Sequence, residues 1–164
     1  MPSIRVKKDL NNEIYFLTFC VVDWNYVLDK YDNWEILLDS VVYCQKEKGL
    51  KVYSLVFMLN HIHLIIQSQD VAGFIRDFKK YTSKRIKNNL FLHDKKLLKY
   101  FIINDKYNFW QKTNMPELIK TEKFYTQKKQ YIENNPVRKK YVKAPQDWVY
   151  SSANPELSIH IDQL

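Results

Sequence analysis

The fold is decided by the stretch LVFMLNHIHLIIQS, residues 55–68, which is rich in β-branched and aliphatic side chains. Because such residues favour extended structure, we predict one strand over residues 50–59 and the next over residues 61–68. Asn60 lies between these two segments and leaves two interpretations open, a tight bend or one continuous extended run. In either case the stretch forms the centre of a sheet.

The flanking segments predict a mixed fold. We expect a strand over residues 13–22, helices over residues 32–48 and 70–89, a short edge strand over residues 116–120 and a last helix from Thr121. Gly49 is a suitable stop for the first helix, and Pro136 must end the last one. Residues 90–116 fit a loop, a short helix or an insertion. This order predicts an α+β, ferredoxin-like split βαβ fold, an antiparallel sheet with helices on one face.

Composition is that of a globular protein. A length of 164 residues favours a single domain, and a hydrophobic fraction of 46% excludes a disordered chain. Cys20 and Cys44 are the only cysteines, so neither a disulfide framework nor a cysteine-rich zinc site is expected. We interpret both as small buried residues.

The N-terminal segment MPSIRVKKDLNNE, residues 1–13, lacks the apolar core of a signal peptide. No apolar run approaches the roughly 20 residues that a membrane span requires. We therefore expect a cytoplasmic, reduced protein without a membrane partner.

Positive charge is concentrated in one segment. The chain has a net charge of +8, and residues 71–101 carry nine basic groups against Asp77 and Asp94, which gives +7 for that segment. Such a segment is typical of proteins that bind a polyanion, although many solvated helices are also rich in lysine.

His61 and His63 are the first candidates for a chemical role. Residues two apart on a strand point to the same face, so these two imidazoles are expected to project side by side. Paired imidazoles suit a divalent metal ion. The alternative is two histidines on a half-exposed face of the sheet.

Tyr131 and Asn135 are the second pair of candidates. Four residues apart on the last helix, they share one face, which brings a phenol beside an amide oxygen. A phenol is a competent nucleophile toward phosphoryl groups when metal and local charge favour the phenolate. The alternative is that Tyr131 only packs the helix, and Asn135 precedes a proline, which disfavours the helical conformation there.

Several runs together resemble the single-tyrosine HUH transposases, and most of all the REP-associated tyrosine transposases, which are IS200-like. The runs are LVFMLNHIHLIIQS, FKKYTSKRI, FWQ, QYIENNPVRKKYV and APQDWVYSSA. The resemblance covers residues 14–153 of a single catalytic domain over residues 1–164, with residues 154–164 as a tail. One departure is Lys139-Lys140-Tyr141, where the family often has a glycine.

The resemblance implies a role for each candidate. His61, His63 and Asn135 would bind Mg²⁺ or Mn²⁺, and Tyr131 on the added C-terminal helix would be the nucleophile. The implied activity is metal-dependent cleavage and rejoining of single-stranded DNA through a 5′-phosphotyrosine, in the transposition of hairpin-flanked elements. The expected DNA-binding residues are Arg76, Lys79, Lys80, Lys84, Arg85, Lys87, Arg138 and Lys139. The expected partner is single-stranded DNA in the form of a hairpin with a single-stranded flank. The oligomeric state is left open by the sequence: a monomer is favoured, and a dimer with shared active sites is the alternative.

Two other functions remain open from the sequence. A non-catalytic, domesticated protein of the same fold would bind single strands by stacking and phosphate contacts. A metal-dependent hydrolase would use water in place of Tyr131 as the nucleophile. A covalent DNA–protein adduct distinguishes these functions.

Overall fold

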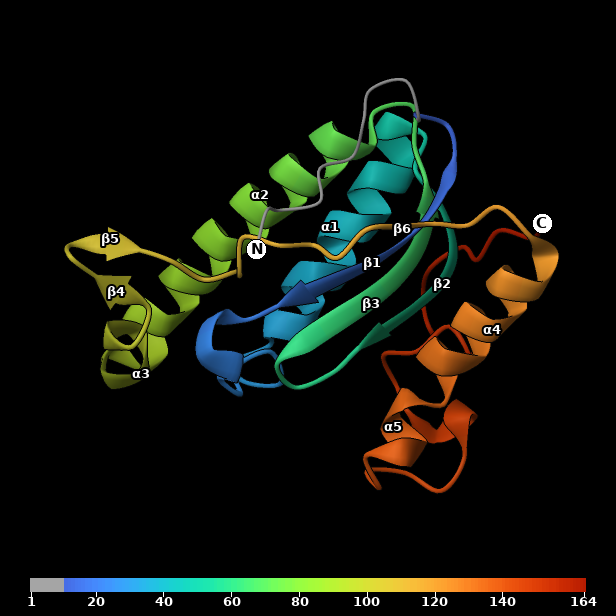
Figure 1. Cartoon of the computed structure of the whole chain (residues 1–164). Helices are drawn as coiled ribbons and strands as arrows, with labels where there is room; N and C mark the ends of the chain where they lie inside the picture. The colour runs from blue at the N-terminus through green and yellow to red at the C-terminus, as the bar shows by residue number, and fades with distance from the viewer. Residues whose placement is uncertain (1–10) are drawn as a thin grey trace.

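The computed structural model of the chain describes residues 11–164 (Figure 1). Residues 1–10, which are most of the N-terminal segment that was expected to lack a signal peptide, lie outside the described residues. The helices and strands in chain order are β1 (Ile14–Cys20), α1 (Asn33–Lys48), β2 (Lys51–Phe57), β3 (His61–Gln67), α2 (Val71–His93), α3 (Lys95–Lys99), β4 (Ile102–Ile103), β5 (Lys106–Tyr107), β6 (Glu117–Leu118), α4 (Glu122–Glu133) and α5 (Asn135–Arg138). Short 3-10 turns occur at Val22–Trp24 and Pro145–Asp147. No helix within residues 11–164 is both long and apolar enough to span a membrane.

The sheet has the strand order β2-β3-β1-β6, and its neighbouring strands run antiparallel. Asn60 lies in a tight bend, so β2 and β3 form a hairpin rather than one continuous run. β1 pairs with β3 along its whole length, which sets Thr18 opposite His63. The predicted edge strand is confirmed as β6, where Glu117 pairs with Phe16 of β1.

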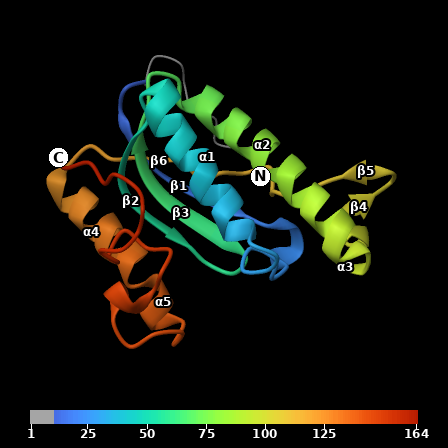
Figure 2. The same cartoon turned by 180° about the vertical axis from the view of Figure 1, so that it is seen from behind.

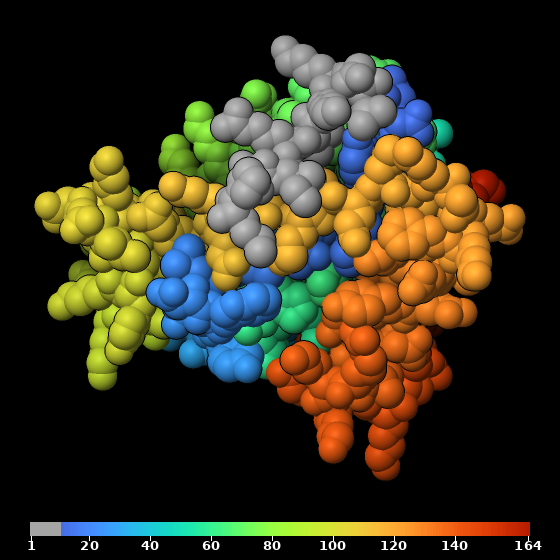
Figure 3. All heavy atoms as spheres, viewed as in Figure 1, coloured from blue at the N-terminus to red at the C-terminus, as the bar shows by residue number. Residues whose placement is uncertain are grey.

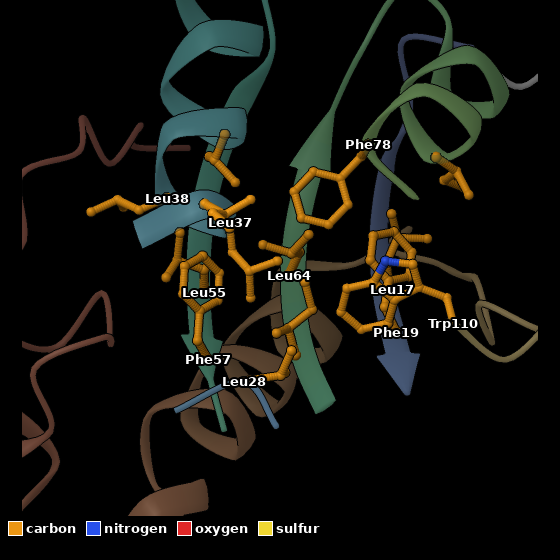
Figure 4. Close-up of a cluster of buried hydrophobic side chains, with 14 of the residues drawn as sticks. Leu17, Phe19, Leu28, Leu37, Leu38, Leu55, Phe57, Leu64, Phe78 and Trp110 are labelled. Atoms are coloured by element: carbon orange, nitrogen blue, oxygen red, sulfur yellow. The ribbon is translucent and has the colours of Figure 1, made fainter. Parts of the chain in front are cut away.

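Helices cover both faces of the sheet. α1 and α2 pack on one face, and α4 lies against the other, as the two opposite views show (Figures 1 and 2). Figure 4 shows the larger core, where Leu17, Leu55 and Leu64 of the sheet meet Leu37 and Phe78 of the helices. A smaller core beneath α4 contains Phe16, Ile65 and Ile132. The predicted α+β arrangement, with an added C-terminal helix that carries the tyrosine, is thereby confirmed.

Helix ends follow from local chemistry. Gly49 ends α1 at a φ of 63°, in the left-handed region that glycine adopts without strain. The Asp70 side chain accepts a hydrogen bond from the Gly73 amide at the start of α2, and Thr121 does the same for Phe124 at the start of α4. These caps fix where both predicted helices begin.

The helix that starts after Thr121 ends before Pro136, as predicted, but the chain does not leave helical structure there. α4 ends at Glu133, close to the expected position, but the chain continues into the short helix α5, which holds Pro136 in its first turn. The first turn of a helix tolerates proline because its amide needs no partner there. Asn135, expected to leave helical geometry, is instead the first residue of α5.

Residues 90–116 contain a short helix, which was one of the alternatives for this segment, and a hairpin that the sequence does not predict. α2 extends to His93, α3 follows, and β4 and β5 form a small separate hairpin. Asn104 and Asp105 turn this hairpin with φ values of 50° and 58°, which suits a tight two-residue turn. The hairpin projects from the body beside α3 (Figure 1).

The C-terminal tail runs along the outer edge of β2. The amide of Val52 donates to the Asp162 carboxylate, and the amide of Leu55 donates to the Ser152 hydroxyl. The amide of Phe57 donates to the Tyr150 carbonyl. Cys20 and Cys44 are both buried and unpaired, as expected.

Candidate active site

His61 and His63 lie at the start of β3, on the sheet face that α4 partly covers. Both imidazoles are buried, and their ring centroids are 4.9 Å apart. Ile62 and Leu64 point to the opposite face and join the larger core. The predicted side-by-side placement of the two imidazoles is confirmed.

A polar side chain orients each imidazole through Nδ1. Asn60 Oδ1 lies 2.7 Å from Nδ1 of His61, while the Asn60 amide nitrogen donates to the Trp24 carbonyl. Because the amide oxygen only accepts, Nδ1 of His61 must donate, and Nε2 keeps its lone pair. Thr18 Oγ1 lies 2.9 Å from Nδ1 of His63. Nε2 of His63 is buried and has no hydrogen-bond partner among the described residues.

Both histidines are neutral near pH 7. Burial, with a contribution from the charge of Lys139, lowers the pKa of His61 to about 4. Burial lowers the pKa of His63 to about 3, helped by the charges of His61, Arg138 and Lys128. A neutral imidazole is the form that binds a metal ion. Both rings are therefore ready to act as ligands without first losing a proton.

Tyr131 lies beside the histidine pair in the same chain. Its ring centroid is 5.3 Å from that of His63 and 6.0 Å from that of Phe16, with edge-to-face geometry in both contacts. The side chain is 38% exposed, so a substrate can reach it. α4 therefore places a phenol at the edge of the buried imidazole pair.

Cationic groups surround this phenol. The Arg138 guanidinium lies 4.2 Å from the Tyr131 ring centroid, and the Lys128 ammonium lies 5.9 Å from it. Lys128 also bonds Glu117 at 2.5 Å and packs 4.4 Å from the Phe16 ring centroid. The field at the site is positive, which favours an incoming phosphate.

Asn135 is buried at the start of α5, one turn beyond Tyr131. Arg138 and Lys139, on and just after α5, act on the pKa values of the two histidines, so this end of the chain adjoins the pair. Among residues 11–164, no cluster of three His, Cys, Asp or Glu side chains could hold a metal ion. A third protein ligand would have to be of another type, and the role of Asn135 stays a prediction.

The predicted DNA-binding residues fall into two groups. Arg138 and Lys139 adjoin the histidines, whereas those on α2 lie across the sheet from them. Lys79 is turned inward: its ammonium donates to the Gln111 carbonyl, and burial lowers its pKa to about 8. Arg76 is bonded to Asp77. The exposed basic residues of α2 are Arg76, Lys80, Lys84, Arg85 and Lys87.

Sequence reasoning missed Thr18, Asn60, Trp24 and Lys128. Lys128 precedes Tyr131 by three residues on one helix, so helical spacing alone could have indicated it. Thr18 becomes a partner of His63 only through the pairing register of β1 with β3, for which a single sequence carries no signal. The other two histidines, His93 and His160, are exposed.

Segments from both ends of the chain flank the sheet. Figure 3 shows the blue segment that includes residues 22–31 on one side and the orange helices α4 and α5 on the other, with green atoms of the sheet between them. Trp24, within the first of these segments, contacts His61, with 5.9 Å between ring centroids.

Comparisons with known proteins give one family. The family model described as "Transposase IS200 like" matches residues 11–135. A solved REP-associated tyrosine transposase bound to a REP hairpin superposes with a TM-score of 0.74 at 19% identity, covering 100% of this chain and 92% of that one. A proposed transposase from Deinococcus radiodurans R1 gives a TM-score of 0.48 at 22% identity, covering 82% of this chain and 97% of that one. No curated protein matches the sequence.

Proposed function

The chain belongs to the IS200-like transposases, and from that premise we propose that it cuts and rejoins single-stranded DNA with Tyr131 as the nucleophile. The observation that carries the proposal is the contact between the Tyr131 and His63 rings within one chain. A phenol beside two neutral, buried imidazoles and two cations is suited to attack on a phosphate.

His61, His63 and Asn135 are the residues that would hold Mg²⁺ or Mn²⁺. The fit rests on the unpartnered Nε2 of His63 and on the Asn60 bond to Nδ1 of His61, which leaves the lone pair of His61 Nε2 free. Nε2 of His63 is likewise free to bind a metal ion when Thr18 Oγ1 accepts the hydrogen bond from Nδ1. An amide oxygen suits such hard cations better than imidazole does, so weak and exchangeable binding is expected. When bound, the ion polarises a phosphoryl oxygen and offsets the charge of the transition state.

The proposed reaction is a transesterification. The Tyr131 phenolic oxygen loses its proton and bonds to phosphorus, while the bond from phosphorus to the preceding 3′ oxygen breaks. That oxygen takes up a proton, which leaves a free 3′-hydroxyl and a 5′-phosphotyrosine. Arg138 and Lys128 lie where they can balance the negative charge that gathers on the phosphate. Rejoining is the reverse attack by a 3′-hydroxyl, so the bond energy is kept and no nucleotide cofactor is needed.

The proposed substrate is a DNA hairpin with a single-stranded flank. The solved relative with this fold is bound to a REP hairpin, which supports a hairpin as the substrate class. Arg138 and Lys139 would contact phosphates near Tyr131, and the exposed basic residues of α2 would contact phosphates farther away. Duplex DNA without a flank should compete poorly, because the proposed reaction at Tyr131 uses an unpaired strand.

A covalent adduct tests the proposal. Labelled hairpin DNA with a single-stranded flank is incubated with the protein and Mg²⁺ or Mn²⁺, then separated under denaturing conditions. Wild type should give a denaturant-resistant adduct, and Tyr131→Phe should give none while retaining its fold and DNA affinity. Tyr125→Phe is the matched control on the same helix, because Tyr125 is buried against Tyr53 away from the histidines.

Each other outcome points to a different function. An adduct that persists in Tyr131→Phe would assign the nucleophile to another residue. Cleavage without an adduct at any time would favour a water nucleophile. Binding with neither cleavage nor adduct would favour the non-catalytic binding protein.

A further inference from the structure

Trp24 is an exposed indole beside the histidine pair. Its side chain is 51% exposed, whereas the other three tryptophans of the chain are buried or partly buried. Its ring meets the His61 ring edge to face, at 71° between the planes. An exposed indole presents a large apolar face that a partner can cover. The cleavage chemistry proposed above does not use this indole.

The backbone holds Trp24 in an uncommon conformation. Asp23 and Trp24 have successive φ values of 53° and 54°, in the left-handed region that residues other than glycine seldom occupy. The Trp24 amide donates to the Val21 carbonyl at 3.0 Å, and the Trp24 carbonyl accepts from Asn60 Nδ2 at 3.1 Å. Asn60 is the same residue that orients His61. The Asn60 side chain therefore links the backbone of Trp24 to the imidazole of His61.

The surroundings suit a base better than a phosphate. Tyr26, two residues beyond Trp24, is exposed, and so is Tyr141, whose pKa is raised first by burial and then by the charges of Tyr26 and Asp29. The basic groups Arg138 and Lys139 adjoin the histidines and attract a phosphate there. The indole beside His61 presents a flat aromatic face to the base next to that phosphate.

We propose that Trp24 is a stacking platform for an unpaired nucleobase of DNA, the base next to the phosphate held at His61 and His63. This inference rests on the proposed function and adds a nucleobase-binding site to it. Stacking on a single aromatic face tolerates any base, because every base has a π face. The platform would position the strand for Tyr131 without selecting a sequence by itself.

Fluorescence of 2-aminopurine tests the platform without cleavage. The probe is a DNA hairpin with a flank of about eight nucleotides, within the span that one such site covers, and 2-aminopurine is placed at each flank position in turn. Binding is measured in EDTA. Wild type should quench the fluorescence at one position, Trp24→Phe should quench it in part, and Trp24→Ala should abolish that quenching and weaken binding roughly 10- to 100-fold. Tyr43→Ala is the control, because Tyr43 is 57% exposed on α1, across the sheet.

A flank with an abasic site at the quenched position completes the test. If Trp24 stacks on that base, wild type should bind the abasic probe more weakly than the intact probe. Trp24→Ala should bind both probes with the same affinity, because the stacking contact is already absent. If the substitution Trp24→Ala lowered the affinity for the intact and the abasic probe by the same factor, the platform would be overturned. An affinity of Trp24→Ala for the intact probe equal to that of wild type would also overturn it. The proposed function fails separately: it requires the Tyr131 adduct, which is assayed with metal and does not depend on quenching.

Discussion

Oγ1 of Thr18 on β1 lies 2.9 Å from Nδ1 of His63 on β3, and this hydrogen bond ties the orientation of a candidate ligand to the register of the sheet. The two residues pair directly across neighbouring strands. Any shift of β1 by one residue would turn Thr18 to the other face and leave the imidazole without its partner.

Replacing Thr18 with valine should weaken metal binding while leaving the fold intact. Valine has nearly the same shape but no hydroxyl, so the His63 ring loses the bond that orients it. A decrease of roughly 10- to 100-fold in Mn²⁺ affinity is expected, measured by calorimetry or by the electron paramagnetic resonance of free Mn²⁺. Thr18→Ser keeps the hydroxyl and should bind nearly as wild type does. Equal affinity of the valine variant would show that this bond does not matter.

Removal of either imidazole should separate cleavage from binding. His61→Ala or His63→Ala should abolish cleavage of single-stranded DNA, because each removes a proposed metal ligand. DNA affinity, measured in EDTA, should stay close to that of wild type, since neither buried ring offers a charge to phosphate. A variant that cuts at the wild-type rate in Mg²⁺ or Mn²⁺ would remove that histidine from the site.

The low pKa values of His61 and His63 predict a specific pH response in the metal-free protein. Both imidazoles should stay neutral from pH 8 to pH 5, followed through their NMR chemical shifts, because their pKa values are about 4 and about 3. The unfolded chain binds these protons near pH 6.5. Stability should therefore fall as the pH drops from 7 toward 4, by up to about 1.4 kcal/mol per pH unit for each histidine. Titration of both rings near pH 6.5 would show that the pair is more open to solvent.

Neutralising the exposed basic residues of α2 should change the salt dependence of DNA binding. Replacing Lys80, Lys84 and Arg85 with glutamine should lower the slope of log affinity against log salt by about 1 for each phosphate that these side chains no longer neutralise. All three side chains are exposed on α2. An unchanged slope would mean that DNA does not run along this helix.

Lys79 supplies a contrast on the same helix. Lys79→Gln should leave the salt slope unchanged, because its ammonium bonds the Gln111 carbonyl inside the protein. It should instead lower the free energy of unfolding by roughly 1 kcal/mol, because the partly buried carbonyl of Gln111 loses its donor. Comparing the thermal unfolding of Lys79→Gln with that of Lys84→Gln separates the effect on stability from the effect on the salt slope.

The sequence carries most of the fold because its local signals agree. Apolar and β-branched runs define the β2–β3 hairpin, and Gly49, Asp70 and Thr121 mark helix ends that the structure confirms. The projection of His61 and His63 follows from strand geometry alone. Each of these features depends on neighbours in the chain.

Features that depend on distant partners are not predictable in the same way. The inward turn of Lys79 depends on the carbonyl of Gln111, far along the chain, and sequence spacing alone makes this lysine resemble part of a solvated basic face. The bridge that Asn60 makes between Trp24 and His61 depends on how a loop returns to the sheet. Pro136 lies in the first turn of α5, where proline is tolerated, and the start of a new helix at this point depends on the surrounding packing.

The tail along β2 covers a strand edge to which another chain could otherwise add. An exposed strand edge is a template on which other chains add strands and aggregate. Val52, Leu55 and Phe57 would each present a free amide there, and the residues from Tyr150 to Asp162 occupy all three. These tail residues lie outside residues 11–135, which the family model matches. By covering the edge of β2, they prevent another chain from adding a strand to the sheet.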